Sequence, residues 1–271
     1  MNNIELLIQN GNTVYSPVVE EGITWELARQ GMPGKLNFTV VKDGLLNFQE
    51  GNAVRMKVNG QNVFYGFIFT KGRDKGNTIR VTAYDQLRYF KNKDTYIYSN
   101  KTASEVIQML AGDFNLQSTG FKIASRVEDN QTLFNIVQNA LDLTLQNTKK
   151  MYVLYDDFGK LTLKNVENMK LNILIDEETG ENYDYNSTID GETYNKIKLS
   201  YENETTGKRE IYIAQDSSNM NAWGTLQYFD TIDEKVNGKA KVNALLSLYN
   251  KKTRKLEMKD AIGDVRVRAG S

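Results

Sequence analysis

Two amino acids that do acid–base and nucleophilic chemistry near neutral pH are missing from this chain. Its 271 residues include no His and no Cys. This excludes Ser-His and Cys-His nucleophile pairs, an imidazole general base, the usual zinc hydrolase sites and disulfides. Carboxylates and lysines are the side chains that remain for catalysis.

Adjacent carboxylates are the candidates for acid catalysis, and they occur at Asp156-Asp157, Glu20-Glu21 and Glu177-Glu178. A glycosidase needs two carboxylates on one sugar, about 5 Å or about 6.5 to 9.5 Å apart, and the sequence does not define that distance. Asp156-Asp157 precedes Phe158-Gly159-Lys160, which is typical of a hairpin turn. We favour the turn, expect the glutamates to be solvated, and predict no catalytic residue.

The acidic segment from Asp176 to Glu192 is the candidate for a cation site. Ca²⁺ prefers several oxygen ligands in a flexible loop, but this segment has no EF-hand spacing. Glycine motifs that hold phosphates are missing from the sequence. We therefore predict a solvated loop or linker here, and no metal or cofactor.

Four aromatic residues, Phe64, Tyr65, Phe67 and Phe69, lie close together and could stack on sugars or bases. A strand that packs on both faces is the alternative. Lys plus Arg and Asp plus Glu both number 34, so no net charge attracts polyphosphate. We favour packing and predict no nucleic-acid partner.

Alternating apolar residues in the N-terminal part predict antiparallel strands that form a small barrel or sandwich. Asn10-Gly11 and Asn59-Gly60 are hairpin signals that need positive φ, and Gly66 is expected to mark a bulge or bend. The predicted strands contain Ile4, Leu6 and Ile8; Leu36, Phe38 and Val40; Val54, Met56 and Val58; Val63 to Phe69; and Ile79, Val81 and Ala83.

The hydrophobic period changes at Thr102, where a helical region is predicted. Thr102-Ala-Ser-Glu105 fits a capping box before one amphipathic helix, and a second helix is expected to begin near Asp129. A hairpin from Tyr152 to Leu163 follows. The two helical stripes are Ala103, Val106, Ile107 and Leu110, and then Leu133, Ile136, Val137, Ala140, Leu141 and Thr144.

Strands are predicted again after residue 192. A hairpin from Ile197 to Ile213 turns at Thr206-Gly207-Lys208. The sequence has no exact repeat, but this hairpin and the one from Val54 to Phe69 could be equivalent parts of two similar barrels. A third helix with one apolar face and two closing strands are expected after it. These elements are marked by Val242, Leu245, Leu246 and Tyr249, by Lys255 to Met258, and by Val265 to Val267.

Several runs in this order resemble the XkdQ/YqbQ family of PBSX-like phage elements. They cover most of the chain, and each run alone is only moderately specific. The runs are Val81 to Tyr96, Asn100 to Ile107, Leu133 to Thr144, Met151 to Leu163, and Thr193-Tyr-Asn-Lys-Ile197.

The resemblance implies a structural baseplate hub, not an enzyme, that joins the tail tube to the central spike of a contractile phage tail or phage-tail-like particle. Such hubs are similar to type VI spike hub regions and are homotrimers, so the implied partners are further copies, the tube, the spike and other baseplate proteins. The implied fold is α+β and mainly β. It has a first β-barrel at 1–98, a small helical and hairpin domain at 99–168, and a second β-barrel region with one helix at 169–271.

Two functional alternatives stay open: a tail-associated cell-wall glycosidase that uses paired carboxylates, and a sugar- or receptor-binding tail module. The family extends beyond Ser271, which fits either a shortened chain or a short member. Residues 1–12 have no signal-peptide pattern, and no apolar run approaches about 20 residues. We expect assembly in the bacterial host cytoplasm and no membrane partner.

The predicted helical stripes can be tested by placing a charge in each. Replacing Ile107 or Ile136 with Asp should lower the free energy of unfolding by several kcal/mol, because an unpaired carboxylate would enter an apolar contact. Chemical denaturation of both variants measures this. Unchanged stability in both would show that the helical faces are wrongly placed.

Overall fold

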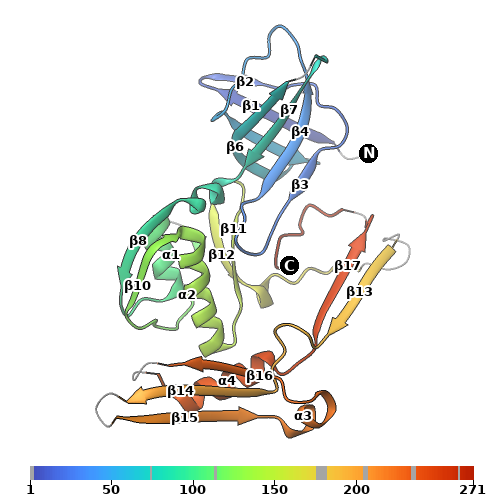
Figure 1. The fold of residues 1–271 in the computed structure, drawn as a ribbon. Coiled ribbons are helices and arrows are strands. Elements are labelled where there is room, and N and C mark those ends of the chain that lie inside the picture. Colours follow the sequence, from blue (N-terminus) through green and yellow to red (C-terminus); the bar gives the residue numbers. More distant parts are fainter. Residues whose placement is uncertain are drawn as a thin grey trace. The chain divides into compact units, whose positions relative to one another are not determined.

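The computed structural model describes residues 3–73, 75–112, 115–174, 182–203, 207–232, 236–261 and 263–271. The chain forms two compact units. The first comprises residues 1–144, 150–171 and 264–271, and the second comprises 145–149 and 172–263. Both are rich in strands and contain few helices, which confirms the mainly β fold class (Figure 1).

The N-terminal part of the first unit is a seven-stranded sheet in which every neighbouring pair is antiparallel. No strand pairing between β2 and β3 closes this sheet within the described residues. From edge to edge the strands are β2 (Thr13–Tyr15), β1 (Ile4–Asn10), β5 (Ala53–Val58), β6 (Gln61–Arg73), β7 (Thr78–Tyr84), β4 (Lys35–Val41) and β3 (Thr24–Glu26).

The predicted alternation places one side chain of every two in the core of this sheet. Burying each large apolar side chain stabilises the fold by about 1.5–3 kcal/mol, so one inward face supplies most of the stability. The buried residues are Leu6, Ile8, Leu36, Phe38, Val40, Phe48, Val54, Met56, Val58, Val63, Phe64, Ile68, Ile79, Val81 and Ala83.

The turns follow the sequence signals with small corrections. Asn59 and Gly60 have φ of 52° and 78°, as predicted, whereas Gly11 has φ of 57° and Asn10 ends its strand. The bulges in β6 lie at Val63 and Phe69, so the bulge expected at Gly66 is absent there.

Gly66 is required for close packing instead of for a bulge. An added Cβ would collide with the carbonyl oxygen of Tyr84 on the neighbouring strand and with the ring of Phe64. Glycine therefore lets β6 approach β7 at this position.

The helical region packs as the stripes predicted. The Thr102–Glu105 capping box is present: the Glu105 N–H donates to Thr102 Oγ1 at 3.2 Å, and the Thr102 N–H donates to Glu105 Oε2 at 2.6 Å. The inward side chains are buried between helices and strands, with Leu110, Leu133 and Leu141 partly buried. The elements are η1 (Gln86–Lys91), β8 (Lys93–Tyr98), α1 (Ala103–Ala111), β9 (Asn115–Leu116), β10 (Arg126–Thr132), α2 (Leu133–Thr148), β11 (Tyr152–Asp156), β12 (Leu161–Asn165) and η2 (Val166–Asn168).

The start of the second helix was predicted too early. Residues 126–132 form β10, which pairs with β8, and α2 begins at Leu133. After a bulge at Asp129 and Asn130, Gln131 and Thr132 pair with Asp94 and Lys93 of β8, so the helix starts only after them. No helix in the described residues is long and apolar enough to span a membrane.

The second unit contains a three-stranded sheet with α4 on one face and a separate two-stranded ribbon. Ile197 and Leu199 pack against Val242 and Leu245 of α4. The sheet has the order β15 (Lys208–Gln215), β14 (Lys196–Asn203), β16 (Gln227–Thr231); the ribbon pairs β13 (Asn182–Thr188) with β17 (Thr253–Lys259); the helices are α3 (Ser217–Trp223) and α4 (Gly238–Tyr249).

Two expectations in this half of the chain were wrong. Residues 182–188 were predicted as loop but form β13, while residues 175–181 and Thr206 lie outside the described part. Val265–Val267 is a turn and not a strand, because Asp264 binds the Arg266 guanidinium and accepts the Val267 N–H at 3.1 Å.

The C-terminal segment returns to the first unit after the second unit is complete. Val265 packs against the core of the seven-stranded sheet. The Arg268 guanidinium lies 5.0 Å from the centre of the Trp25 ring. The first unit is thus assembled from sequence on both sides of the second.

The role of Gly66 predicts a local difference between two glycines. Gly66→Ala should lower the free energy of unfolding by about 1–3 kcal/mol, because the backbone of β7 must move. Gly44→Ala is the matched control, since its added Cβ meets no atom within 4 Å, and it should change stability by less than about 0.5 kcal/mol. Urea denaturation compares them, and equal effects would contradict the packing role.

Candidate functional site

The carboxylates that the structure brings together are Asp85 and Asp156, not Asp156 and Asp157. Asp85 follows β7 and caps η1: its Oδ1 accepts the Leu87 N–H at 3.0 Å and its Oδ2 accepts the Gly34 N–H at 2.8 Å. The Asp85 N–H in turn donates to the Gly34 carbonyl at 3.0 Å. The side chain is only 5 % exposed.

Asp156 ends β11 and forms the turn that the sequence predicted. Its Oδ1 accepts the Gly159 N–H at 2.6 Å, and the Asp157 N–H donates to the Lys160 carbonyl at 2.8 Å. Phe158 and Gly159 have φ of 53° and 87°. Asp157 points to solvent, so it is a turn residue and not the partner of Asp156.

Burial raises the pKa of both carboxyl groups. The pKa of Asp85 is raised to about 8, first by burial and then by the negative charge of Asp156, although two backbone N–H groups oppose the shift. Burial raises the pKa of Asp156 to about 6, against the hydrogen bond from Gly159. At neutral pH the pair therefore holds a proton on Asp85, a protonation pattern often found in acid catalysts.

This pair is placed for structure more than for chemistry on a substrate. Both oxygens of Asp85 accept backbone hydrogen bonds, which leaves little freedom to reach a ligand. Glu20 and Glu21 lie elsewhere, at a groove, and Glu177-Glu178 is outside the described residues. Within the described residues, no group of three or more Asp or Glu side chains could hold a metal ion.

The aromatic residues of β6 divide between the two faces of the strand. Phe64 is buried in the core, while Tyr65, Phe67 and Phe69 point outward and are half-buried. The outer rings contact one another and neighbours through edge and tilted geometries, with Phe69 5.5 Å from Tyr84 between ring centres. The strand packs on both faces, as the favoured interpretation predicted.

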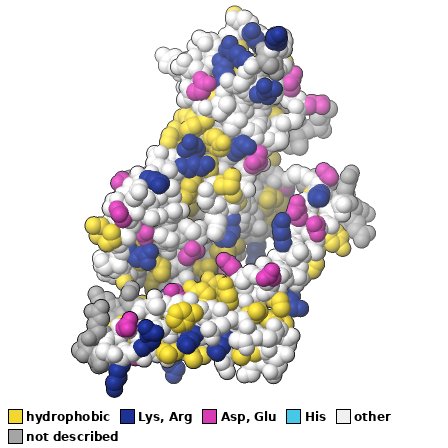
Figure 2. Space-filling view, viewed as in Figure 1, with side chains coloured by type: hydrophobic (Ala, Val, Ile, Leu, Met, Phe, Trp, Pro, Cys, Tyr) yellow, Lys and Arg dark blue, Asp and Glu magenta, His cyan; other side chains and the backbone are white. Residues whose placement is uncertain are grey.

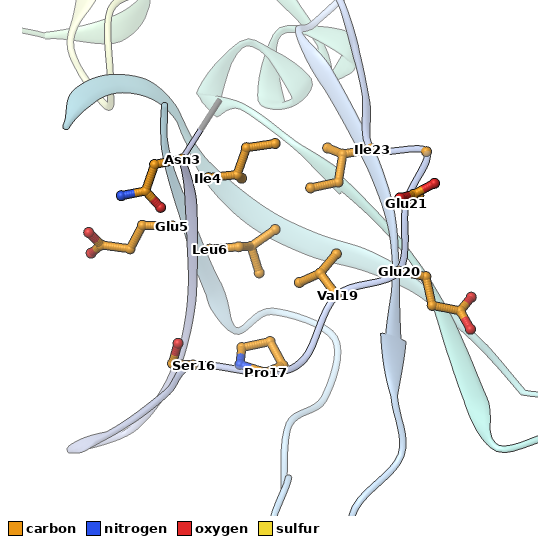
Figure 3. A pocket seen from close by; sticks show the side chains of 11 residues that line it. Asn3, Ile4, Glu5, Leu6, Ser16, Pro17, Val19, Glu20, Glu21 and Ile23 are labelled. Carbon is orange, nitrogen blue, oxygen red and sulfur yellow. The ribbon is translucent and has the colours of Figure 1, made fainter. Parts of the chain in front are cut away.

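A groove of about 650 Å³ lies between β1 and the segment 16–23 (Figure 3). Its apolar side chains point toward one another, whereas Glu5 and Glu20 point away from the opening. The lining consists of Asn3, Ile4, Glu5, Leu6, Ser16, Pro17, Val19, Glu20, Glu21, Gly22 and Ile23.

Two apolar strand faces of the second unit have no cover from described residues. In the β13–β17 ribbon, Tyr183 and Tyr185 pair with Met258 and Leu256, so all four share one face. Tyr183 is 69 % exposed, and Tyr185 and Leu256 are also exposed. We call this the ribbon face.

The second exposed surface is the side of the three-stranded sheet that α4 does not cover. Lys198 is the register partner of both Ile213 and Phe229, and Ile211 lies two residues from Ile213 on the same face. Ile211, Ile213 and Phe229 are each at least half exposed. We call this the sheet face; Figure 2 shows hydrophobic and basic side chains together over β14, β15 and β16.

Sequence reasoning named neither face as functional. The alternation in Asn182-Tyr-Asp-Tyr-Asn186 is a strand signal that could have located β13. It was obscured by the Asp, Asn and Gly around it, which are typical of loops.

Comparison with known proteins gives one family over nearly the whole chain. A family model described as YQBQ-like matches residues 23–271. The YqbQ protein of Bacillus subtilis strain 168 is 32 % identical over 277 residues, covering 96 % of this chain and 83 % of its own. Protein XkdQ of the phage-like element PBSX from the same strain is 32 % identical over 284 residues, covering 98 % and 85 %.

A solved structure supports the fold. The crystal structure of the 43 kDa tail protein of prophage MuSo2 from Shewanella oneidensis superposes with a TM-score of 0.66 at 13 % identity, covering 92 % of this chain and 78 % of that chain. At this identity the likeness concerns the fold alone.

The raised pKa values of Asp85 and Asp156 predict that stability falls as pH rises. Between the ordinary carboxyl pKa near 4 and the folded values of about 6 and 8, the folded state binds protons that the unfolded state has released. The free energy of unfolding should fall by about 1.4 kcal/mol per pH unit for each such proton. Denaturation series from pH 5 to pH 8 measure the slope.

Asp85→Asn should flatten this slope, because the replaced side chain no longer titrates. Asp184→Asn is the matched control at an exposed carboxylate in the second unit and should keep the slope of the unmodified chain. A slope that is the same in Asp85→Asn as in the unmodified chain would contradict the assignment.

Proposed function

This chain belongs to the YQBQ-like family, and from that membership we propose that it is a structural, non-catalytic hub in the baseplate of a contractile phage tail or tail-like particle. The hub would join the tail tube to the central spike and contact other baseplate proteins. The XkdQ relative is named for a phage-like element and the MuSo2 protein is named as a tail protein. Both names support a tail role.

The observation that carries the proposal is the pair of uncovered apolar strand faces in the second unit. Exposed apolar patches on strands mark surfaces that a partner covers, because they otherwise invite nonspecific association. The sheet face combines Ile211, Ile213 and Phe229 with Lys198, whose Nζ lies 5.9 Å from the centre of the Phe229 ring. Such a surface suits a permanent assembly contact.

We extend the proposal to the domain plan and the symmetry. Residues 1–98 would be one β-barrel module, 99–168 the helical and hairpin domain, and 169–271 the second barrel module, completed by the three-stranded sheet and the ribbon on assembly. Three copies with two modules each would form a ring of six similar units that meets a sixfold tube. Such a ring needs heterologous contacts between neighbouring modules.

The glycosidase alternative has less support from the described residues. Its best carboxylate pair would be Asp85 and Asp156, and the Asp85 oxygens both accept backbone N–H groups. This arrangement indicates that the Asp85 carboxyl group stabilises the fold and does not bind a sugar. The half-buried aromatic row on β6 likewise favours packing over sugar binding.

A double substitution on the sheet face tests the assembly role. Ile213→Glu with Phe229→Glu should leave the thermal stability of the isolated chain nearly unchanged, since both side chains are exposed, and should abolish tail assembly by adding charge to the contact. Electron microscopy of particles from cells that carry only the variant gives the readout.

The matched control is Gln215→Glu with Gln227→Glu, which adds the same charge at exposed polar positions of the same face. It should assemble normally. Normal assembly of the first variant would contradict the role of the sheet face. A reconstruction of the intact tail with six copies of this chain, or one β-module per copy, would contradict the trimeric hub.

A further inference from the structure

The groove beside β1 exposes the backbone edge of a strand. β2 pairs with β1 only at residues 8–10 and leaves it after Tyr15. Residues 18–20 then lie along β4. The Glu20 N–H donates to the Thr39 carbonyl, and the Val41 N–H donates to the Val18 carbonyl, each at 2.9 Å. The groove is the space between the free edge of β1 and residues 16–23.

The direction of the β1 backbone groups follows from their neighbours. Asn3 exchanges hydrogen bonds with Asn59, so its N–H and C=O face β5. Antiparallel strands alternate this direction at every residue, so the N–H and C=O groups of Ile4 and Leu6 face the groove. Neither residue has a backbone partner on that side within the described residues.

The side chains show the same missing neighbour. Ile4 lies on the same face of β1 as the buried Leu6 and Ile8, yet it is 47 % exposed. Val19 and Ile23 point toward it across the opening (Figure 3). A core-facing side chain with this exposure indicates an uncovered position at the rim of the core.

The rim of the groove is acidic. Glu5, Glu20 and Glu21 line it, and none of its described lining residues is Lys or Arg. Glu5 forms a long ion pair with Lys57, whose Nζ lies 4.0 Å from Glu5 Oε1. Glu20 and Glu21 form no ion pair among the described residues. A ligand with positive charge at the rim would be favoured.

We propose that this groove is a strand-addition site for an extended, basic segment of another protein. The added strand would pair with Ile4 and Leu6 and complete the interrupted sheet edge. Alternate side chains of the segment would be apolar, against Ile4 and Val19, and the others Lys or Arg near the glutamates. The site goes beyond the hub role and does not depend on it.

The test uses the full chain and the acetylated, amidated hexapeptide KVTVKV, which alternates apolar and basic or polar side chains. Amide exchange of the labelled chain is followed by NMR as peptide is added to about 1 mM. The amides of Ile4 and Leu6 should gain protection, whereas those of Glu5 and Leu7 already face β5. This alternation distinguishes strand addition from nonspecific binding.

Two variants separate the backbone and charge contributions. Ile4→Pro removes the amide that faces the groove, at the first residue of the strand where proline is tolerated, and should weaken binding at least about tenfold; Ile4→Val retains the amide and should not. The double variant Glu20→Lys with Glu21→Lys should weaken the binding of KVTVKV to a similar extent. It should instead favour the binding of the acidic peptide EVTVEV. Glu50→Lys is the exposed control and should change neither affinity.

Three results would overturn the proposal. One is no binding of KVTVKV, and another is binding without added protection at Ile4 and Leu6. The third is protection of these two amides in the free chain as its own concentration rises, which would assign the groove to a second copy.

Discussion

The arrangement of the first unit depends on a reciprocal contact between Asp85 and Gly34. The Gly34 N–H donates to the Asp85 carboxyl while the Asp85 N–H donates to the Gly34 carbonyl, so the beginning of β4 is held to the end of β7. The same carboxyl caps η1, through which the chain enters the helical region. Gly34 has no alternative here, because any Cβ would collide with the Asp85 carboxyl.

This contact joins sheet geometry to electrostatics. A carboxyl group that must sit inside the protein to receive two N–H groups has lost its hydration, and Asp156 nearby adds negative charge. Protonation of Asp85 removes both the cost of burying its charge and its repulsion with Asp156. The sequence alone would suggest that Asp85 is an ordinary surface carboxylate. In the structure Asp85 is buried, and its raised pKa favours the protonated form.

Local patterns explain what could be predicted from the sequence. β1, β4, β5 and β7 alternate strictly, and the Thr102–Glu105 box uses neighbours in the chain, so each signal was complete within a few residues. Asp85 and Gly34 are 51 residues apart, and nothing near Asp85 marks its partner. β13 depends on β17 about seventy residues later, while Val265-Arg-Val267 alternates like a strand but is turned by the Asp264–Arg266 ion pair. The groove beside β1 also arises only in three dimensions, where β2 leaves its neighbour.

The return of residues 264–271 to the first unit has a consequence for synthesis on the ribosome. Contacts such as Arg268 on Trp25 and Val265 on the sheet core join residues that are synthesised before the second unit to residues that are synthesised after it. The N-terminal sheet emerges early but lacks these contacts until the whole second unit has been made. Because domains usually fold as units during synthesis, the second unit can fold before the first is finished, and residues 264–271 then complete the sheet core that the N-terminal strands began.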